Sequence, residues 1–181
     1  MPRLTVVDPA TAEPRARALL GKVERALGMT PNMMKTMAGS PAVLDAYLSF
    51  SGALSKGRLP AAVQEQIALA VAVVNECGYC LAAHTVLGAR AGVSEEDLVS
   101  GRHARATDPK VEAALRFALA VVSTKGFVAD GDLADVRAAG YDDGEIGEII
   151  AAVALNTFTN YFNSVGDTQL DFPAIDTTTS H

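Results

Sequence analysis

The chain has 181 residues, which is enough for one domain with a substantial core. Hydrophobic residues make up 49% of it and charged residues only 20%, which excludes an intrinsically disordered protein. The net charge of -6 provides no basic face to neutralise phosphates, so we expect no nucleic-acid partner.

Two observations on hydropathy bear on location. The N-terminal stretch MPRLTVVDPATAEPRA lacks the apolar core of a signal peptide. The longest unbroken apolar run, Ile67 to Val74, is well below the roughly 20 residues that a membrane span needs. We therefore expect no membrane partner and a cytoplasmic location. In that compartment a cysteine pair is more often catalytic, redox-active or metal-binding than structural.

Helical spacing of apolar residues, interrupted by Pro, Gly and capping residues, divides the first half of the chain into helices. The expected segments are Asp8 to Leu27, Ser40 to about Leu54, an apolar helix that starts at Pro60, and Cys77 to about Ala91. The methionine-rich stretch MTPNMMKTMAGS is predicted to be a loop or a short helix. The run VQEQIALAVAVV is apolar enough to lie in the interior.

The second half follows the same pattern and shows no convincing β alternation. The predicted helices are a short one opened by Ser94, then Asp108 to Thr124, about Asp132 to Ala138, and Glu145 to about Asn163. The fold class is therefore all-α, a single-domain bundle of seven or eight helices. GRHAR, from Gly101 to Arg105, is the densest basic cluster, and His103 within it is expected in a surface loop.

The only two cysteines, Cys77 and Cys80, stand with His84 in the spacing C-x-x-C-x-x-x-H. Gly78 relaxes the backbone there, so we expect a helix to begin near Cys77. Cysteines at i and i+3 in a first helical turn are neighbours, and the helix N-terminus favours a thiolate. His84 lies one turn beyond Cys80, where an imidazole can accept the thiol proton or stabilise the thiolate.

The two cysteines need not act alike. Cys80 has the histidine and is the better candidate for the attacking thiolate. Cys77, nearer the helix start, is expected to be the more exposed and to resolve a sulfenic acid on Cys80 into a disulfide. External thiols would then have to reduce that disulfide.

These residues resemble a known family. With Glu65 they match the E-x11-C-x2-C-x3-H pattern of the alkylhydroperoxidase-D-like branch of the carboxymuconolactone decarboxylase-like superfamily. NMMKTMAGSPAVLDAY, GYCLAAHTVLGARAGVSEEDL and NTFTNYFNSVGDTQLDFP resemble its peroxidase-related subgroup. The resemblance implies an N-terminal helical extension over residues 1–29, an alkylhydroperoxidase-D-like helical domain over residues 30–173, and a flexible tail over residues 174–181.

The same resemblance implies a thiol-dependent peroxidase that acts on hydrogen peroxide or organic hydroperoxides. Cys80 attacks, Cys77 resolves, and His84 with Glu65 relays a proton. The implied partners are a hydroperoxide, an unidentified thiol reductant and further copies of the chain, as a trimer or hexamer. No cofactor and no metal are implied, because the thiols carry the chemistry.

Two features set conditions on this interpretation. Tyr79 stands where well-characterised members have a second histidine, and an unperturbed tyrosine with a pKa near ~10 shuttles protons poorly at neutral pH. Glu65 would lie about 18 Å from Cys77 along a straight helix. It reaches the site only if the chain turns between Asn75 and Gly78.

Alternatives remain open. The cysteine pair could be a redox sensor or a partner-binding switch, or simply buried packing. Two thiolates and His84 could also hold zinc with Glu65, His103 or water as fourth ligand, in a zinc- or lyase-type enzyme on the same fold. Asn156 and Asn160 are equally consistent with helix packing and with a role near the site. The methionines from Met33 to Met37 are expected to fill the core or an interface.

Overall fold

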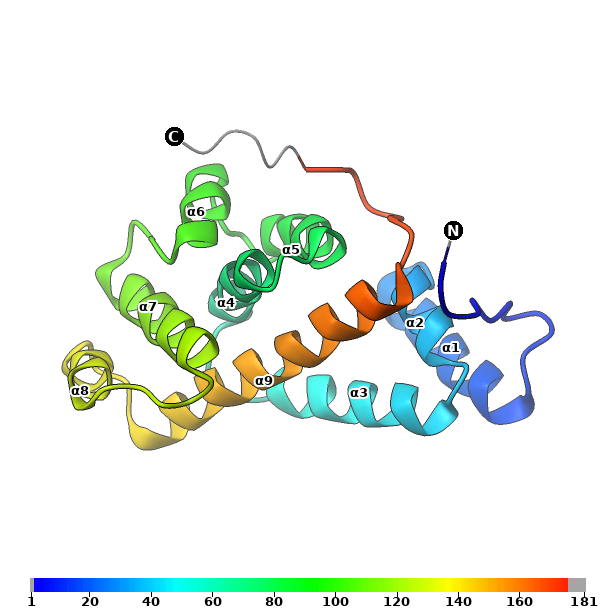
Figure 1. Ribbon diagram of the computed structural model, residues 1–181, viewed down its shortest axis with the longest axis horizontal. Coiled ribbons are helices and arrows are strands. Elements are labelled where there is room, and N and C mark those ends of the chain that lie inside the picture. Colours follow the sequence, from blue (N-terminus) through cyan, green and yellow to red (C-terminus); the bar gives the residue numbers. More distant parts are fainter. Residues whose placement is uncertain (1, 176–181) are drawn as a thin grey trace.

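The computed structural model describes residues 2–175, and these are entirely helical, with no strand. Their helices are α1 (Pro14–Leu27), α2 (Asn32–Met37), α3 (Pro41–Leu54), α4 (Ala61–Val74), α5 (Gly78–Arg90), α6 (Glu95–Ser100), the 3-10 helix η1 (Gly101–His103), α7 (Pro109–Thr124), α8 (Asp130–Ala138) and α9 (Asp143–Gly166) (Figure 1). The all-α prediction is confirmed. The described part has nine α-helices rather than seven or eight, because the methionine-rich stretch also forms a helix.

The predicted division of the chain stays a prediction, and residues 176–181 of the predicted tail lie outside the described residues. The N-terminal segment is closely packed on the rest, since buried residues of α1 share one hydrophobic cluster with α2, α3 and α5. Within residues 2–175 no helix combines the length and the apolarity that crossing a membrane would require.

Helix α4 lies at the centre of the bundle, where it contacts α5, α7 and α9 (Figure 1). Val63, Ile67 and Val71 belong to the cluster formed with α7, α8 and α9. Leu69 and Ala72 belong to the other cluster, on the side of α1 to α3 and α5. A helix that is apolar on all sides can be stable only when it is covered on all sides. The predicted interior position of this segment is confirmed.

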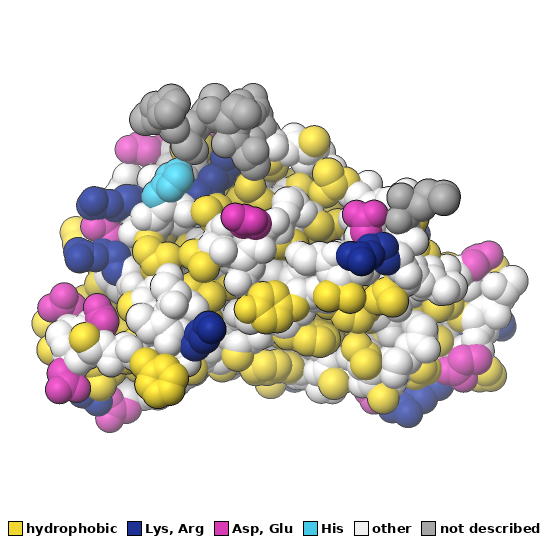
Figure 2. Space-filling view, in the orientation of Figure 1, with side chains coloured by type: hydrophobic (Ala, Val, Ile, Leu, Met, Phe, Trp, Pro, Cys, Tyr) yellow, Lys and Arg dark blue, Asp and Glu magenta, His cyan; other side chains and the backbone are white. Residues whose placement is uncertain are grey.

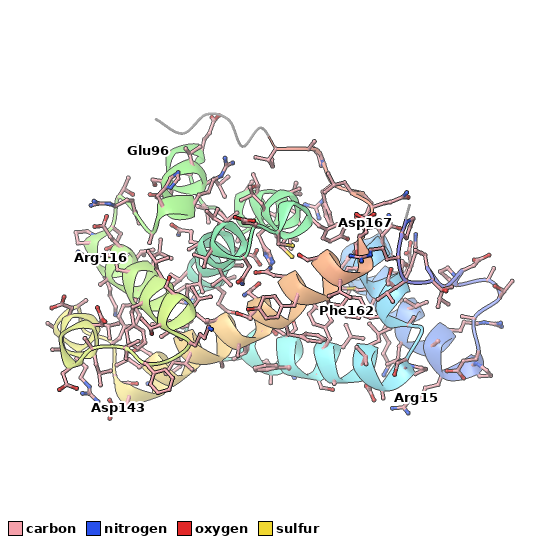
Figure 3. The ribbon with its side chains drawn as sticks, viewed as in Figure 1. Arg15, Glu96, Arg116, Asp143, Phe162 and Asp167 are labelled. Carbon is pink, nitrogen blue, oxygen red and sulfur yellow. The ribbon has the colours of Figure 1, made fainter. Side chains whose placement is uncertain are left out.

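Helix α9 runs across the molecule beneath α4 and alongside α3; Asp143 and Asp167 mark its two ends (Figure 3). Its N-terminus is tied to the connection between α3 and α4. Arg58 donates to both carboxylate oxygens of Asp142, the α9 N-cap, at 2.6 Å, and the Glu148 carboxylate accepts from the backbone N–H groups of Arg58 and Leu59. These contacts fix how far α9 reaches towards α5 at its other end.

The chain reverses between α4 and α5, as the site requires. Glu76 adopts the left-handed conformation with φ of 51°, a backbone shape that costs a non-glycine residue roughly 1–2 kcal/mol. The Cys77 N–H then bonds to the Ala72 carbonyl at 2.9 Å, and the Asn75 amide donates to Asn160 of α9 at 2.9 Å. The turn therefore provides a hydrogen-bond donor for a backbone carbonyl at the end of α4, and it places Cys77 at the N-cap of α5.

Gly88 allows α5 to lie close to its neighbours. A Cβ atom at this position would come within 2.8 Å of Leu98 Cδ2 and 3.6 Å of Glu65 Cβ. A side chain here would displace the Leu98 side chain of α6, so the glycine favours the close packing of α5 against α6 and α4.

We expect Gly88→Val to lower the free energy of unfolding by about 1–3 kcal/mol, because the added carbons overpack the contact between α4, α5 and α6. Urea denaturation followed by circular dichroism measures this change. Gly131→Val is the matched control, since Gly131 is exposed on α8 and has nothing within 4 Å of its built Cβ position. Equal stability of the two variants would contradict the packing role of Gly88.

Candidate active site

Glu65 and His84 meet across the contact between α4 and α5. The His84 Nδ1 atom lies 2.7 Å from Glu65 Oε2, and both side chains are about one-fifth exposed. Antiparallel packing thus brings together two residues that are 19 positions apart, through the turn that the sequence only permitted. With Nδ1 held by the carboxylate, Nε2 is the ring nitrogen available for proton transfer.

Cys80 lies in the first turn of α5, surrounded by polar groups from α9. The Asn163 amide Nδ2 donates to Cys80 Sγ at 3.2 Å and to Met33 Sδ at 3.2 Å. Cys77 Sγ, at the N-cap, accepts from the Cys80 N–H at 3.4 Å. These side chains come from α2, α5 and α9, so the thiol pair sits where three helices converge.

The surroundings separate the acidities of the two thiols. A hydrogen bond from Cys77 lowers the pKa of Cys80 to about 6, against burial, with help from His84, Asn163 and Asn160. The pKa of Cys77 is raised, first by that shared proton and then by burial. At neutral pH Cys80 is therefore the thiolate and Cys77 the thiol that donates to it.

The imidazole is held close to its charged form. Burial opposes protonation of His84, but the Glu65 carboxylate and the Cys80 thiolate outweigh burial and raise the pKa of His84 above its ordinary value. A cationic imidazole between a carboxylate and a thiolate is an arrangement that can store a proton and deliver it to a leaving group.

Cys77 is the more exposed of the two cysteines, as predicted, but only slightly. Cys77 is only 4% exposed and Cys80 2%, and both are free thiols. Cys77 is buried because its N–H donates to the Ala72 carbonyl of α4 and its side chain accepts from the first turn of α5. Neither sulfur lies at the protein surface, so a reactant reaches the pair only through a cavity.

The cavity at Cys80 is about 490 Å³ and mostly apolar. Cys80, His84 and Glu65 lie on its wall. Further residues of α4 and α5 complete the lining with residues of α1, α2, α3, α9 and the segment after α9, among them Met33, Met34, Tyr47, Leu87 and Phe172. The methionines predicted as core or interface are buried, and Met33 and Met34 also face this cavity.

Tyr79, between the cysteines, is a structural residue in this fold. Its hydroxyl accepts from the Met33 N–H at 3.3 Å, and its ring packs edge-on against Phe172 with centroids 5.8 Å apart. Burial and the neighbouring Asp171 carboxylate raise its pKa, so it holds its proton at neutral pH. Tyr79 therefore fixes α2 and the C-terminal segment around the cavity instead of relaying protons.

The sequence analysis missed four residues that contribute to this site. Asn163 donates directly to Cys80, but only the neighbouring Asn156 and Asn160 stood out at helical spacing. Tyr47 of α3 lines the cavity together with Glu65 and Cys80. Burial raises the pKa of Tyr47 to about 12, and the charges of Glu65 and Cys80 add to this. Val23 and Leu27 of α1 line the cavity. The i+3 step from Asn160 to Asn163 was the one available signal.

The ligand set considered for zinc is not assembled. Glu65 is hydrogen-bonded to His84, whereas His103 lines a different cavity. Among residues 2–175 no group of three or more His, Cys, Asp and Glu side chains is arranged to hold a metal ion.

Comparisons with known proteins extend this picture. Residues 41–124 match the carboxymuconolactone decarboxylase family. A peroxidase-related protein from Ralstonia eutropha with an alkylhydroperoxidase AhpD core has the same fold, with a TM-score of 0.84 and 24% identity over 94% of this chain and 92% of that chain. A peroxidase-related protein from Silicibacter sp. also has this fold, with a TM-score of 0.76 and 23% identity over 92% of each chain.

A third solved structure is that of the debrominase Bmp8 in complex with 2,3,4-tribromopyrrole, with a TM-score of 0.80 and 20% identity over 93% of this chain and 91% of that chain. No curated protein matches the chain in sequence. The fold and site define an all-helical protein with a buried dithiol. The chain is similar to the carboxymuconolactone decarboxylase family over residues 41–124, and its fold is that of an alkylhydroperoxidase AhpD core.

We expect alkylation of Cys80 by iodoacetamide to rise with pH around a midpoint of about 6, the pKa of its thiolate. Below that pH the thiol is protonated and unreactive; above it the rate levels off. Cys77→Ala removes the strongest stabilising hydrogen bond and should move the midpoint up towards the ordinary ~8.5. Asn163→Leu should move it less. Peptide mass spectrometry identifies the alkylated residue.

The matched control is Thr157→Leu, a substitution of a half-buried α9 residue outside this hydrogen-bond network, which should leave the midpoint in place. A wild-type midpoint near that of an ordinary cysteine would contradict the assignment of the thiolate to Cys80.

Proposed function

We propose that this protein is a thiol-dependent peroxidase that reduces organic hydroperoxides through a dithiol–disulfide cycle of Cys80 and Cys77. The observation that carries the proposal is a buried thiolate, Cys80, which faces an apolar cavity beside the hydrogen-bonded pair of Glu65 and His84. The thiolate, a proton donor and a cavity for the substrate thus lie next to one another, as a nucleophilic thiol site requires.

In the first step the Cys80 thiolate attacks the terminal oxygen of the hydroperoxide. The O–O bond breaks and the S–O bond forms, which gives a sulfenic acid on Cys80 and an alkoxide. The alkoxide takes the proton of the His84 imidazolium and leaves as an alcohol. Glu65 stabilises the imidazolium before the transfer and orients the neutral ring afterwards.

In the second step the Cys77 sulfur attacks Cys80 Sγ, and the hydroxyl group leaves as water with the Cys77 proton. The balance is one hydroperoxide and two thiols to one alcohol, one water and one disulfide. Cys77 adjoins Cys80 at the N-cap, which supports a short path for this attack. Two equivalents of an external thiol then restore the dithiol.

The character of the cavity supports an organic hydroperoxide over hydrogen peroxide. Its volume of about 490 Å³ exceeds what a molecule the size of hydrogen peroxide fills, and aliphatic and aromatic side chains dominate its wall. Burial of an apolar tail contributes about 25 cal/mol per Å² of apolar surface. The cycle needs a reducing compartment, so the proposal includes a cytoplasmic location.

A second candidate is thiol-dependent reduction of a halogenated aromatic compound. The debrominase with the same fold was crystallised with a tribromopyrrole, and this chain's cavity has the aromatic side chains of Tyr47, Tyr79 and Phe172 in its wall. The two thiols would supply both electrons, the halogen would leave as halide and a proton would take its place on the ring. The same oxidation assay distinguishes the two substrates.

We expect cumene hydroperoxide to oxidise the wild-type dithiol faster than hydrogen peroxide does in stopped-flow experiments. Cys80→Ser should abolish the reaction, and Cys77→Ser should halt it at the sulfenic acid. Glu65→Gln and His84→Ala should slow it by about 100-fold or more, the usual worth of a positioned proton donor. Glu96→Gln, an exposed carboxylate on α6, is the control and should react like wild type.

Oxidation at the rate of a free thiol would refute the peroxidase proposal. Faster oxidation by 2,3,4-tribromopyrrole than by either peroxide, with release of bromide, would favour the second candidate.

We propose in addition that the protein assembles into a trimer or hexamer through the outer face of α9. Figure 2 shows hydrophobic side chains gathered over this helix. Four large ones are exposed at helical spacing: Ile150, Phe158, Tyr161 and Val165. A contiguous apolar stripe of this kind is typical of an interface.

We expect light scattering after size exclusion to give the mass of a trimer or hexamer for the wild type and a smaller mass for Val165→Glu, because a carboxylate at the stripe would have to be buried without a partner. Ser164→Glu, one residue away and outside the stripe, is the matched control. A monomeric wild type would contradict this part of the proposal.

A further inference from the structure

A second cavity lies on the other side of the cysteine pair. It measures about 420 Å³, and the residues that matter here are Glu76, Cys77, Gly78, Leu81, Arg102 and His103. It shares no lining residue with the cavity at Cys80. We call the two spaces the Cys80 cavity and the Cys77 cavity.

The lining residues of α5 divide between the two cavities. Cys80, Ala83 and His84 line the Cys80 cavity, whereas Gly78, Leu81 and Cys77, the N-cap of the helix, line the Cys77 cavity. Helix α4 divides along its length, because Glu65 and Ala68 line the Cys80 cavity, and Ala72 and Val73, about one turn further on, line the Cys77 cavity. Each sulfur of the pair is therefore reached from a different side.

The Cys77 cavity has one permanent cation in its lining, the guanidinium of Arg102, which belongs to the basic cluster that the sequence analysis singled out. Arg102 and His103 of η1 both line it, and His103 is exposed, as expected. The Arg102 Nε atom is buried and has no hydrogen-bond partner within residues 2–175. Glu76 contributes one carboxylate at the rim. A guanidinium with an unused buried donor beside a thiol favours a ligand that bears an anionic group.

We propose that the Cys77 cavity binds the thiol reductant, and that this reductant is a small anionic thiol whose carboxylate pairs with Arg102 and His103. The inference rests on the proposed dithiol–disulfide cycle and adds to it a class of reductant and a side of entry. The oxidising substrate would occupy the Cys80 cavity, so neither reactant has to leave before the other enters.

The chemistry follows from the placement of the sulfurs. The reductant thiolate attacks Cys77 Sγ of the disulfide; a new S–S bond forms to Cys77, the old one breaks, and Cys80 leaves as a thiolate. A second reductant thiolate then attacks the reductant's own sulfur in the mixed disulfide and expels Cys77, which takes up a proton. The products are the dithiol protein and the reductant disulfide.

Attack on this sulfur also uses the better leaving group. Exchange is faster when the departing thiol has the lower pKa. Cys77 has no proton to share while it is held in the mixed disulfide, but His84, Asn163 and Asn160 still lower the pKa of Cys80, whereas burial raises that of Cys77. The lower pKa of Cys80 therefore favours attack by a reductant that enters through the Cys77 cavity, because Cys80 is then the departing thiolate.

The test measures reduction of the preformed disulfide, made with diamide, so it does not depend on peroxide. The probes are mercaptosuccinate, neutral 2-mercaptoethanol and cationic cysteamine, each compared per thiolate present. We expect mercaptosuccinate to react about 10-fold faster than 2-mercaptoethanol, because the Arg102 cation attracts its carboxylates. This advantage should shrink at high salt, which screens the attraction. Arg102→Gln should remove the advantage and Arg102→Lys should restore part of it.

Arg116→Gln, an exposed cation on α7 outside the cavity, is the matched control and should keep the wild-type preference (Figure 3). Peptide mapping of early mixed disulfides should find mercaptosuccinate on Cys77. An adduct on Cys80, equal rates for the three probes, or equal effects of Arg102→Gln and Arg116→Gln would overturn the inference. If diamide forms no disulfide, the dithiol cycle itself fails instead.

Discussion

The contact of Glu65 with His84 across two packed helices is the interaction on which the site depends. The two residues meet at 2.7 Å because the chain reverses sharply after α4 and because Gly88 lets α5 lie against α4 and α6. Without the carboxylate the pKa of this partly buried imidazole would be lower, since burial alone disfavours its charge. The backbone strain at Glu76 is thus repaid by a charged pair beside the sulfur.

Around that contact the fold makes two chemically similar cysteines unequal. Cys80 receives hydrogen bonds from its partner thiol and from Asn163, and it feels the imidazole of His84. Cys77 keeps the proton that the pair shares. The asymmetry comes from three helices that are distant in sequence, so it is a property of the packing more than of the C-x-x-C motif.

The sequence predicts what depends on local spacing. Capping residues and helical periodicity placed most helices correctly, and the interior position of α4 followed from its uniform apolarity. The spacing from Cys77 to His84 predicted the shared face of α5. The role of Glu65 was predicted only through the family resemblance. Nothing in the sequence near Glu65 indicates that a turn ten residues later brings it next to His84.

What the sequence could not predict depends on tertiary contacts. Asn163 becomes a donor to Cys80 only because Arg58 and Glu148 fix where α9 begins. Both cysteines are almost fully buried, with Cys77 only slightly the more exposed, because the N–H bond from Cys77 to Ala72 folds the start of α5 against α4. The separation of two cavities by α5 is likewise a matter of three-dimensional packing.

The length of α9 has a mechanical consequence. A helix of 24 residues is about 36 Å long and moves nearly as a rigid rod. Asn160 and Asn163 point from it towards the sulfur, while Tyr161 and Val165 point from the same two turns to the outside. A rotation of the rod by a few degrees would shift both sets together. Contacts on the outer face of α9 are therefore coupled mechanically to the reactivity of the buried Cys80 thiol.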